Sequence, residues 1–338
     1  MRIECNFPLK SLNTFGVAAT ARYFVDARSA SDIREALTWA GEQGLRTIIL
    51  GGGSNILFIK DIDGLVLHMG IRGIEVRRLE GGKLLVTAAA GENWESIVRW
   101  AVGKGYGGIE NLSGIPGSAG AAPVQNIGAY GVEFGEICRN VTALERSTGK
   151  IREFSAKECR FGYRNSFFKE QAEEWVVLSI SMILDRGAPL RTEYGALRET
   201  LSCPGRAKAC FADVAEAVLN IRGQKLPRPE ELGSAGSFFK NPVIPAPQYQ
   251  QLCASYPDLP GFEQEDGSIK LSAAWLLDTA GWKGKKEGKV GCYSQQPLVL
   301  VNHGSASGQE VLDFSLTIQK SIMDSFGISL ERETVLYP

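Results

Sequence analysis

Apolar residues recur every three or four positions in several stretches of the chain, which predicts amphipathic helices. We expect these helices at residues 29–40, 92–102, 213–222, 272–279 and 307–326. Ser29 with Asp32, and Ser307 with Glu310, place a capping side chain at the start of the first and the last of them. Gly327 ends the last helix, because glycine readily follows a helix C-terminus.

Strands are predicted where apolar residues alternate with polar ones or form short uninterrupted runs. These segments are residues 47–50, 64–69, 74–78, 83–89, 141–146, 150–154, 175–184, 297–302 and 328–336. Ser147, Thr148 and Gly149 join two of them as a hairpin turn. Residues 224–229, QKLPRP, are expected to break regular structure and to mark a domain boundary.

A long stretch of small residues follows the second predicted helix. Residues 111–131 read NLSGIPGSAGAAPVQNIGAYG and contain no charged side chain and one bulky aromatic, Tyr130. A second such stretch, GGGSN at residues 51–55, directly follows the strand predicted at 47–50. Because small side chains let backbone N–H groups approach a ligand, the two stretches favour a site for a large phosphate-bearing cofactor. The alternative interpretation is a pair of flexible glycine turns.

Residues 103–108, GKGYGG, match the G-x-G-x-x-G pattern of dinucleotide-binding loops. That pattern should follow a strand and begin a helix, whereas here it closes the helix predicted at residues 92–102. We therefore interpret it as a helix C-cap and turn, and not as a Rossmann motif.

Composition and charge exclude several classes of partner. The 338 residues are expected to form two or three domains, and 44% hydrophobic with 22% charged residues is typical of soluble globular proteins. A formal net charge of -1 gives no overall attraction to nucleic acid or to an anionic membrane. No apolar stretch reaches membrane-spanning length, and the N-terminus lacks the apolar core of a signal peptide. The seven cysteines include no C-x-x-C pair, which favours free thiols in a reducing cytoplasm.

Histidine is scarce, because His68 and His303 are the two in the chain. A histidine-rich metal site is thereby excluded, and we expect no bound metal. For each histidine a structural or solvated role is the preferred interpretation.

The segment GSAGSFFKNP at residues 233–242 is a candidate for chemistry, because it places Ser237, Lys240 and Asn241 among glycines and aromatics. Nucleophilic catalysis by Ser237 is disfavoured, since few histidines are present to activate it. Its hydroxyl could instead donate a proton to a strongly basic carbon, and a turn or cap serine is the structural alternative.

Positive side chains gather just before this segment and within it. Arg222, Lys225, Lys240 and Lys270 could neutralise a diphosphate or a carboxylate. The lysine-rich run at residues 283–289 is interpreted as a solvated loop, and Glu331 and Glu333 as solvent-facing residues of the final strand.

Several motifs, taken in order, resemble a single family. They are NTFG at residues 13–16, GGGSNIL at 51–57, GGIENLSGIPGSAGAAPVQNIGAYG at 107–131, ECRFGYRNS at 158–166, KLP at 225–227 and AGSFFKNP at 235–242. Together they resemble the UDP-N-acetylenolpyruvoylglucosamine reductases, flavoenzymes that make UDP-N-acetylmuramate for bacterial peptidoglycan. The Tyr-Gly-x-Leu segment at Tyr194 is similar to that of the family branch with an extra tyrosine-bearing loop. One departure is Tyr293, where the family has a histidine.

The resemblance implies an α+β fold, with a two-part FAD-binding unit of the vanillyl-alcohol-oxidase-like type plus a smaller α/β substrate domain. The first FAD-binding part would comprise residues 1–70 with a C-terminal strand at 331–338, and the second part residues 71–226. The substrate-binding domain would comprise residues 227–330.

The same resemblance implies the site residues. Non-covalent FAD would contact Gly51, Gly52, Gly53, Ser54, Asn55, Ile115, Pro116, Gly117, Ser118, Gly120, Ala121, Gly128, Tyr130 and Arg222. The UDP-sugar would contact Tyr194, Lys225, Asn241, Lys270 and Gln296. The catalytic residues would be Ser237, Glu333 and Arg164.

The implied reaction is the NADPH-dependent, FAD-mediated reduction of UDP-N-acetylglucosamine enolpyruvate to UDP-N-acetylmuramate in the cytoplasm. NADPH would reduce the flavin, which would pass hydride to the vinyl carbon, and Ser237 would protonate the neighbouring carbon. The small-molecule substrate implies no nucleic-acid, membrane or obligate protein partner. Two alternatives stay open: an FAD-dependent oxidase of the same fold, and a UDP-sugar-binding protein without redox activity.

Overall fold

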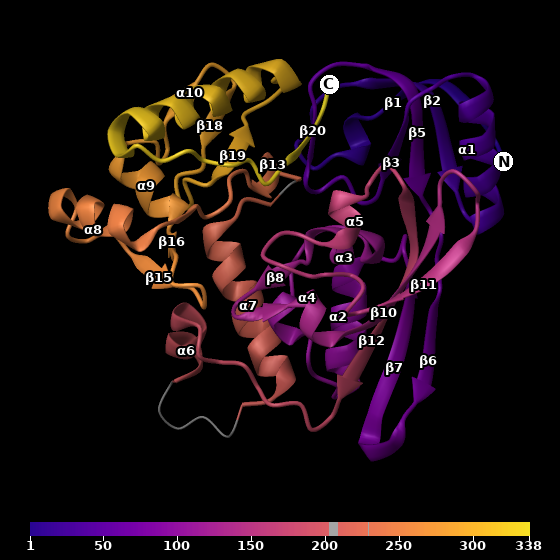
Figure 1. The fold of residues 1–338 in the computed structure, drawn as a ribbon, viewed down its shortest axis with the longest axis horizontal. Helices are drawn as coiled ribbons and strands as arrows, with labels where there is room; N and C mark the ends of the chain where they lie inside the picture. Colours follow the sequence, from indigo (N-terminus) through magenta and orange to yellow (C-terminus); the bar gives the residue numbers. More distant parts are fainter. Residues whose placement is uncertain (203–208, 229) are drawn as a thin grey trace. The chain divides into compact units, whose positions relative to one another are not determined.

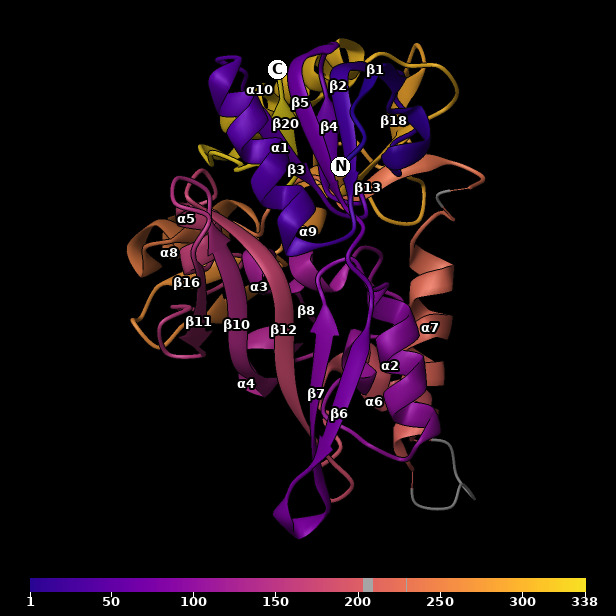
Figure 2. The same cartoon turned by 90° about the vertical axis from the view of Figure 1, so that its right-hand side faces the viewer.

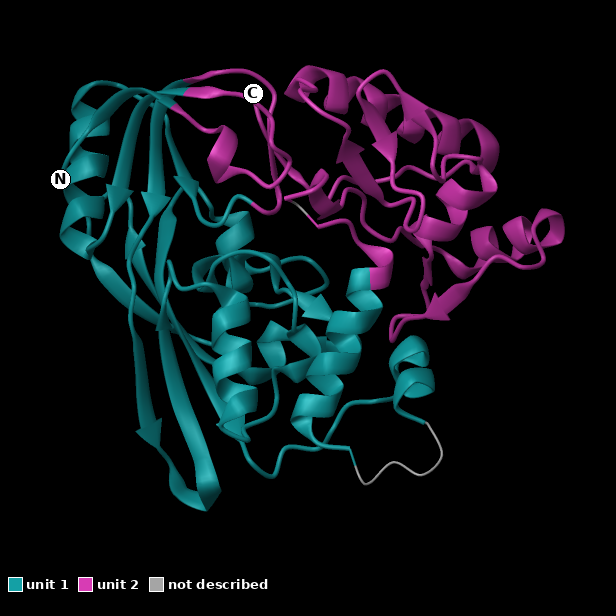
Figure 3. Ribbon diagram, turned by 180° about the vertical axis from the view of Figure 1, so that it is seen from behind, with its two compact units in different colours: residues 1–7, 21–53, 63–223 teal, residues 8–20, 54–62, 224–338 magenta. Residues whose placement is uncertain are grey.

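The computed structural model describes residues 1–202, 209–228 and 230–338 of the chain (Figure 1). Two compact units can be distinguished, each with its own apolar core (Figure 3). Unit 1 comprises residues 1–7, 21–53 and 63–223, and unit 2 comprises residues 8–20, 54–62 and 224–338. Pro229, in the segment predicted as a domain boundary, lies outside the described residues. The domain limits given by the resemblance stay a prediction.

The first sheet of unit 1 has the strand order β1-β2-β5-β3. Its strands are β1 (Glu4–Pro8), β2 (Thr20–Ala27), β3 (Thr47–Leu50) and β5 (Ile62–Met69). β3 and β5 pair in parallel, with Thr47 opposite Leu65. Helix α1 (Ala30–Glu42) buries Ile33 and Ala36 in the same core as these strands. The predictions for α1 and β3 are confirmed, whereas β2 was not predicted.

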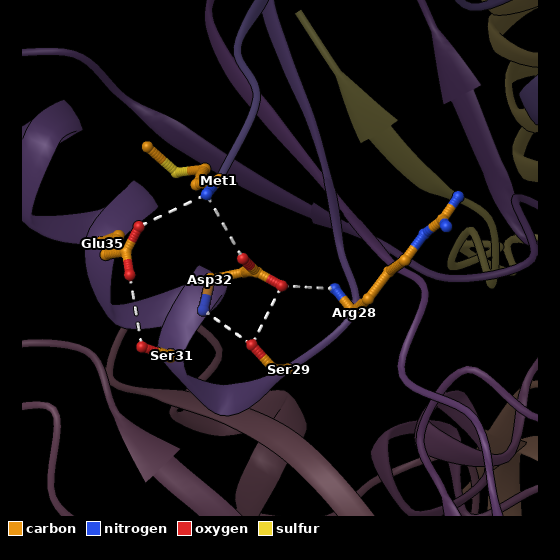
Figure 4. A network of polar contacts seen from close by, with 6 residues as sticks. All are labelled: Met1, Arg28, Ser29, Ser31, Asp32 and Glu35. Carbon is orange, nitrogen blue, oxygen red and sulfur yellow. Dashed lines mark hydrogen bonds and ion pairs between the residues drawn. The ribbon is translucent and has the colours of Figure 1, made fainter.

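The start of α1 also holds the N-terminus of the chain (Figure 4). Ser29 caps the helix, since its hydroxyl oxygen accepts the N–H of Asp32 at 3.1 Å. The Met1 ammonium lies 3.6 Å from a carboxylate oxygen of Asp32 and 3.5 Å from one of Glu35. The acidic first turn therefore both favours the helix and ties down the terminal strand.

The second sheet of unit 1 has the order β11-β10-β12-β7-β6, and its pairs are antiparallel (Figure 2). The strands are β6 (Ile74–Arg78), β7 (Lys83–Ala89), β10 (Cys138–Glu145), β11 (Ile151–Ser155) and β12 (Trp175–Asp185). The predicted hairpin is confirmed as β10 and β11. Helix α2 (Trp94–Gly103) buries Trp94, Ile97, Val98 and Ala101 in the core of this unit, and its end at Gly103 confirms that GKGYGG closes a helix.

The remaining elements of unit 1 are short, apart from one helix. They are α3 (Ala122–Gln125), β8 (Gly128–Ala129), β9 (Val132–Glu133), α4 (Phe134–Ile137), α5 (Phe167–Glu170), α6 (Gly195–Leu201) and α7 (Phe211–Lys225). Helix α7 was predicted to end at residue 222 but continues to Lys225. Lys225, expected in the break at residues 224–229, is therefore the last residue of a helix.

Unit 2 contains small sheets covered by helices. Its four-stranded sheet has the order β13-β19-β18-β17, from β13 (Gly233–Ser237), β17 (Lys286–Glu287), β18 (Val290–Cys292) and β19 (Val299–Asn302). The smaller sheets are β14 (Val243–Ile244), β16 (Ile269–Leu271) and β15 (Gly261–Glu263), and the parallel pair β4 (Ile56–Phe58) with β20 (Val335–Tyr337). Its helices are α8 (Ala246–Ser255), α9 (Ala273–Thr279) and α10 (Gly308–Phe326).

Helix α10 confirms both predicted limits. The capping box of Ser307 and Glu310 is present, and Gly327 follows the helix with a left-handed φ of 65°. The predicted final strand at residues 328–336 is wrong in extent, because only Val335–Tyr337 is a strand. Ile328 and Leu330 instead pack into the core of unit 2, and the Gln319 side chain donates to the Leu330 carbonyl. A side chain thus occupies a backbone acceptor that a strand ladder would have used.

Candidate active site

The two glycine-rich loops lie against each other in unit 1. A Cβ added at Gly52 would lie 2.8 Å from Cα of Gly117, and one at Gly51 would lie 2.5 Å from Oγ of Ser118. Gly53 and Gly117 adopt φ values of 62° and 125°, which glycine tolerates best. Backbone therefore meets backbone at Gly52, an approach that only residues without a side chain allow.

The loop of residues 115–121 is anchored on the strand and helix that precede it. The N–H of Ala119 donates to the Glu92 carbonyl, and that of Gly120 to the Ala90 carbonyl, both at 2.8 Å. A Cβ at Gly120 would lie 2.6 Å from Cβ of Ala90, so this glycine is also required by packing. The structure thus brings Gly51 and Gly52 against Gly117 and Ser118. The other predicted cofactor residues of these two loops in unit 1 are Gly53, Ile115, Pro116, Gly120 and Ala121.

Helix α7 brings Arg222 to the start of the same loop. Its Nε donates to the Gly114 carbonyl at 3.2 Å, while the Gly114 N–H donates to a Glu95 carboxylate oxygen at 2.6 Å. Burial lowers the pKa of Arg222, an effect opposed by the nearby Tyr130 and Glu95. Glu95 was missed by sequence analysis, because nothing in the pattern of α2 distinguishes it from a solvent-facing residue.

A tight hairpin turn joins β8 and β9 and carries Tyr130. Tyr130 and Gly131 both have positive φ, 50° and 80°, as a type I′ turn requires. Nη2 of Arg164 donates to the Gly128 carbonyl at 3.1 Å, so the predicted catalytic arginine lies at this hairpin. Burial raises the pKa of Tyr130, an effect that the Arg222 charge opposes.

Tyr194 immediately precedes helix α6 and meets the same turn. Its ring centroid lies 5.3 Å from that of Tyr130 in an edge-on arrangement, although Tyr194 is 53% exposed. Unit 1 therefore groups Gly128, Tyr130, Arg164 and Tyr194 around one hairpin.

In unit 2 the structure brings Ser237 and Glu333 close along the backbone. Ser237 ends β13, opposite Val299 of β19. The Glu333 N–H donates to the carbonyl of Phe238, the next residue after Ser237, at 2.8 Å. Nδ2 of Asn55 donates to the Glu333 carbonyl at 3.2 Å. The expectation that Glu333 is a solvent-facing residue of the final strand is wrong, because Glu333 precedes that strand and is half-buried.

The predicted substrate residues of unit 2 are more dispersed. Oδ1 of Asn241 accepts the N–H of Ala273 at the start of α9, and Lys270 lies opposite Val243 in the small sheet. Gln296 lies in the turn before β19, where its carbonyl accepts the Val299 N–H. Lys225 is the exposed last residue of α7, and Ser54 precedes Asn55 at the start of this unit's β4 segment.

The histidines and cysteines have structural surroundings. His68 lies on β5 with Nδ1 2.8 Å from Asp26, and burial lowers the pKa of His303. The cysteines within the described ranges are free thiols. In the same part of the chain, no cluster of three or more His, Cys, Asp or Glu side chains could hold a metal ion. Nor is any helix there both long and apolar enough to cross a bilayer.

Comparison with known proteins covers both units. A family model described as FAD binding domain matches residues 21–155, and the model of the UDP-N-acetylenolpyruvoylglucosamine reductase C-terminal domain matches residues 228–337. The UDP-N-acetylenolpyruvoylglucosamine reductase of Pseudomonas fluorescens Pf-5 is 46% identical over 99% of both chains, and that of Amoebophilus asiaticus is 44% identical over 98% of both. The crystal structure of the Thermus caldophilus UDP-N-acetylenolpyruvylglucosamine reductase superposes with a TM-score of 0.69 at 22% identity, covering 100% of both chains.

These findings first define a class. The glycine loops lie within the residues that match the FAD binding domain, so the chain is a flavoprotein with a separate C-terminal domain. Similarity at 46% identity over nearly the whole chain is more specific. The chain belongs to the UDP-N-acetylenolpyruvoylglucosamine reductase family. The predicted family and α+β fold class are thereby confirmed.

Proposed function

We propose that this chain reduces UDP-N-acetylglucosamine enolpyruvate to UDP-N-acetylmuramate for peptidoglycan synthesis, with FAD as bound cofactor and NADPH as hydride donor. The observation that carries this proposal is the 46% identity to a UDP-N-acetylenolpyruvoylglucosamine reductase over 99% of both chains. When bound, FAD accepts a hydride from NADPH and returns it to the substrate, and the protein supplies orientation and charge. The reaction uses small soluble molecules, so we assign it to the cytoplasm without a protein partner.

The residues of unit 1 fit the cofactor. Gly52 and Gly117 meet backbone to backbone, so peptide N–H groups of these two loops would bind the pyrophosphate. Arg222 is half-buried and permanently charged, so it favours an anionic phosphate near Gly114. Gly128 and Tyr130 would border the remaining part of the cofactor.

The UDP-sugar would be recognised by Tyr194, Lys225, Asn241, Lys270 and Gln296. Lys225 and Lys270 supply point charges for the diphosphate, and Tyr194 supplies an exposed ring. Oδ1 of Asn241 already accepts the Ala273 N–H, so its amide N–H groups are the part that would face the substrate.

The chemistry would use three residues. Hydride arriving at the vinyl carbon leaves negative charge on C2 and on the adjacent carboxylate of the substrate. Arg164, by its positive charge, and Glu333, as a carboxylic acid that donates a hydrogen bond, would polarise that carboxylate, which stabilises charge present only in the transition state. Ser237 would then donate its hydroxyl proton to C2; a serine is a very weak acid, but an enolate carbon is basic enough to take its proton.

Replacing Ser237 by alanine tests this proposal. Loss of one general acid lowers rates by ~10²–10⁴-fold, and we expect that loss in turnover of Ser237→Ala. Flavin reduction by NADPH should keep a near-normal rate, because hydride transfer to the flavin needs no proton from Ser237. Stopped-flow absorbance of the flavin, measured anaerobically, follows the two half-reactions separately.

Ser234→Ala, a buried serine on the same strand β13, is the matched control and should leave both half-reactions unchanged. If flavin reduction collapsed in Ser237→Ala while reoxidation by the enolpyruvyl substrate stayed fast, the role given to Ser237 would be wrong. Reoxidation by oxygen alone, with no acceleration by the substrate, would instead favour an oxidase.

A further inference from the structure

Asn111 is a buried side chain that joins the β8–β9 turn to the loop before α6. It is 1% exposed and lies within a short helical turn at the start of the uncharged stretch. Its Nδ2 donates to the Tyr130 carbonyl at 2.9 Å and to the Arg191 carbonyl at 2.8 Å. One amide nitrogen therefore holds two backbone segments that are 61 residues apart in the sequence (191 − 130).

Both segments carry a tyrosine assigned above to a ligand. The carbonyl of Tyr130 accepts one of these hydrogen bonds. Tyr194 lies three residues after Arg191, whose carbonyl accepts the other. Their rings meet edge-on at 5.3 Å with an interplanar angle of 76°. Since Tyr194 is 53% exposed, little packing restrains its side chain. Its position therefore depends on the hydrogen bond that holds the backbone of its loop at Arg191.

The side chain of Asn111 has one unfavourable feature that its two donated hydrogen bonds must offset. Its Oδ1 is buried without a hydrogen-bond partner, and a buried unpaired acceptor costs free energy. Aspartate, serine and leucine cannot donate two N–H bonds from one atom. An asparagine at position 111 is therefore explained by the two hydrogen bonds that its Nδ2 donates and by the two backbone segments that these bonds join.

We propose that Asn111 is a positioning residue for the UDP-sugar, which acts by clamping the Tyr194 loop to the Tyr130 turn. The proposal rests on the function given above, in which Tyr194 contacts the UDP-sugar. Asn111 itself touches neither substrate nor cofactor in this account. Without Asn111 the loop that carries Tyr194 would be more mobile, so part of the free energy of binding would go into ordering Tyr194.

A double-mutant cycle on the holoenzyme tests the inference, with the Kd of UDP-N-acetylglucosamine enolpyruvate measured by isothermal titration calorimetry on the oxidised protein. Edge-on aromatic contacts correspond to about 2–10-fold in affinity, and we expect Asn111→Ala to raise Kd by that factor. In the Tyr194→Ala background the same substitution should add nothing, because its effect passes through Tyr194. The FAD content of Asn111→Ala should equal that of the wild type. Asn111→Ser, which loses the paired donors without burying a charge, serves if the alanine variant does not fold.

Asn302→Ala is the matched control, because Asn302 is also a buried asparagine whose Nδ2 donates to a distant backbone carbonyl, that of Phe15. It should lower stability without changing Kd. The inference is overturned if Asn111→Ala raises Kd equally in the Tyr194→Ala background, leaves Kd unchanged, or removes FAD. An unchanged Kd in Tyr194→Ala alone would separately reject the substrate role of Tyr194.

Discussion

At position 52 the absence of a side chain lets two loops of unit 1 meet, since a Cβ there would lie 2.8 Å from Cα of Gly117. We expect Gly52→Ala to force the loops apart and to cost about 1–3 kcal/mol of the free energy of unfolding, as overpacking does. FAD affinity should fall with it, because the peptide groups move. Thermal denaturation and fluorescence titration of the apoprotein with FAD measure the two effects.

Gly41→Ala is the control for this substitution. Gly41 lies in α1 with no atom near its missing Cβ, so alanine there should stabilise the protein by about 0.5–1 kcal/mol. If Gly52→Ala bound FAD as tightly as the wild type, the loop contact would not be part of the cofactor site.

Lys225 gives a second prediction at the scale of one residue. It is an exposed ammonium at the end of α7, so its interaction with a diphosphate is screened by salt. Lys225→Ala should raise the Kd of the UDP-sugar, and the difference from the wild type should shrink as ionic strength rises. Lys283→Ala removes a loop lysine that is paired with Asp278. It should change neither the Kd of the UDP-sugar nor the dependence of that Kd on ionic strength. An equal loss of FAD from Lys225→Ala would assign this lysine to the cofactor.

At the scale of the elements, the N-terminal capping box of α10 should make a pH-dependent contribution to the stability of the protein. The backbone N–H and the hydroxyl of Ser307 donate to Glu310 at 2.7 and 2.9 Å, and together with Lys289 they lower the pKa of that carboxyl below its ordinary 4.5. This contribution is present above the ordinary pKa and is lost as pH falls through the lowered pKa of the folded state. Urea denaturation at about pH 6 and about pH 4 should therefore show a smaller loss of stability for Glu310→Gln than for the wild type. Identical losses in the two proteins would mean that the cap contributes nothing.

At the scale of the whole molecule, we expect FAD to be held without a covalent bond. The loops at residues 51–55 and 115–121 contain neither histidine nor cysteine, the side chains that could attach to the isoalloxazine ring. His68 is engaged with Asp26 at 2.8 Å. Denaturing the purified protein should release all flavin into the supernatant. Yellow colour that stays with the precipitated polypeptide would contradict this prediction.

Sequence patterns that span only a few residues were enough to predict the helices in which they occur. The caps at Ser29 and Ser307 predicted two helix starts, and the spacing of apolar residues predicted the buried face of α2. The structure confirms both, because capping and periodicity act within one or two turns. The motifs likewise indicated the family, because the glycines that permit close backbone approach can be read directly from the sequence.

Contacts between distant residues were decided only by the tertiary structure. The Glu95–Gly114–Arg222 arrangement and the Asn111 clamp join positions up to 108 residues apart, and neither Glu95 nor Asn111 differs in local pattern from an ordinary polar residue. The last segment reads as a long strand by alternation, yet Ile328 and Leu330 are drawn into the core of unit 2 and only Val335–Tyr337 pairs with β4. Burial in the core of unit 2 outweighs β-propensity there, because propensity is a weak term beside the packing of whole side chains.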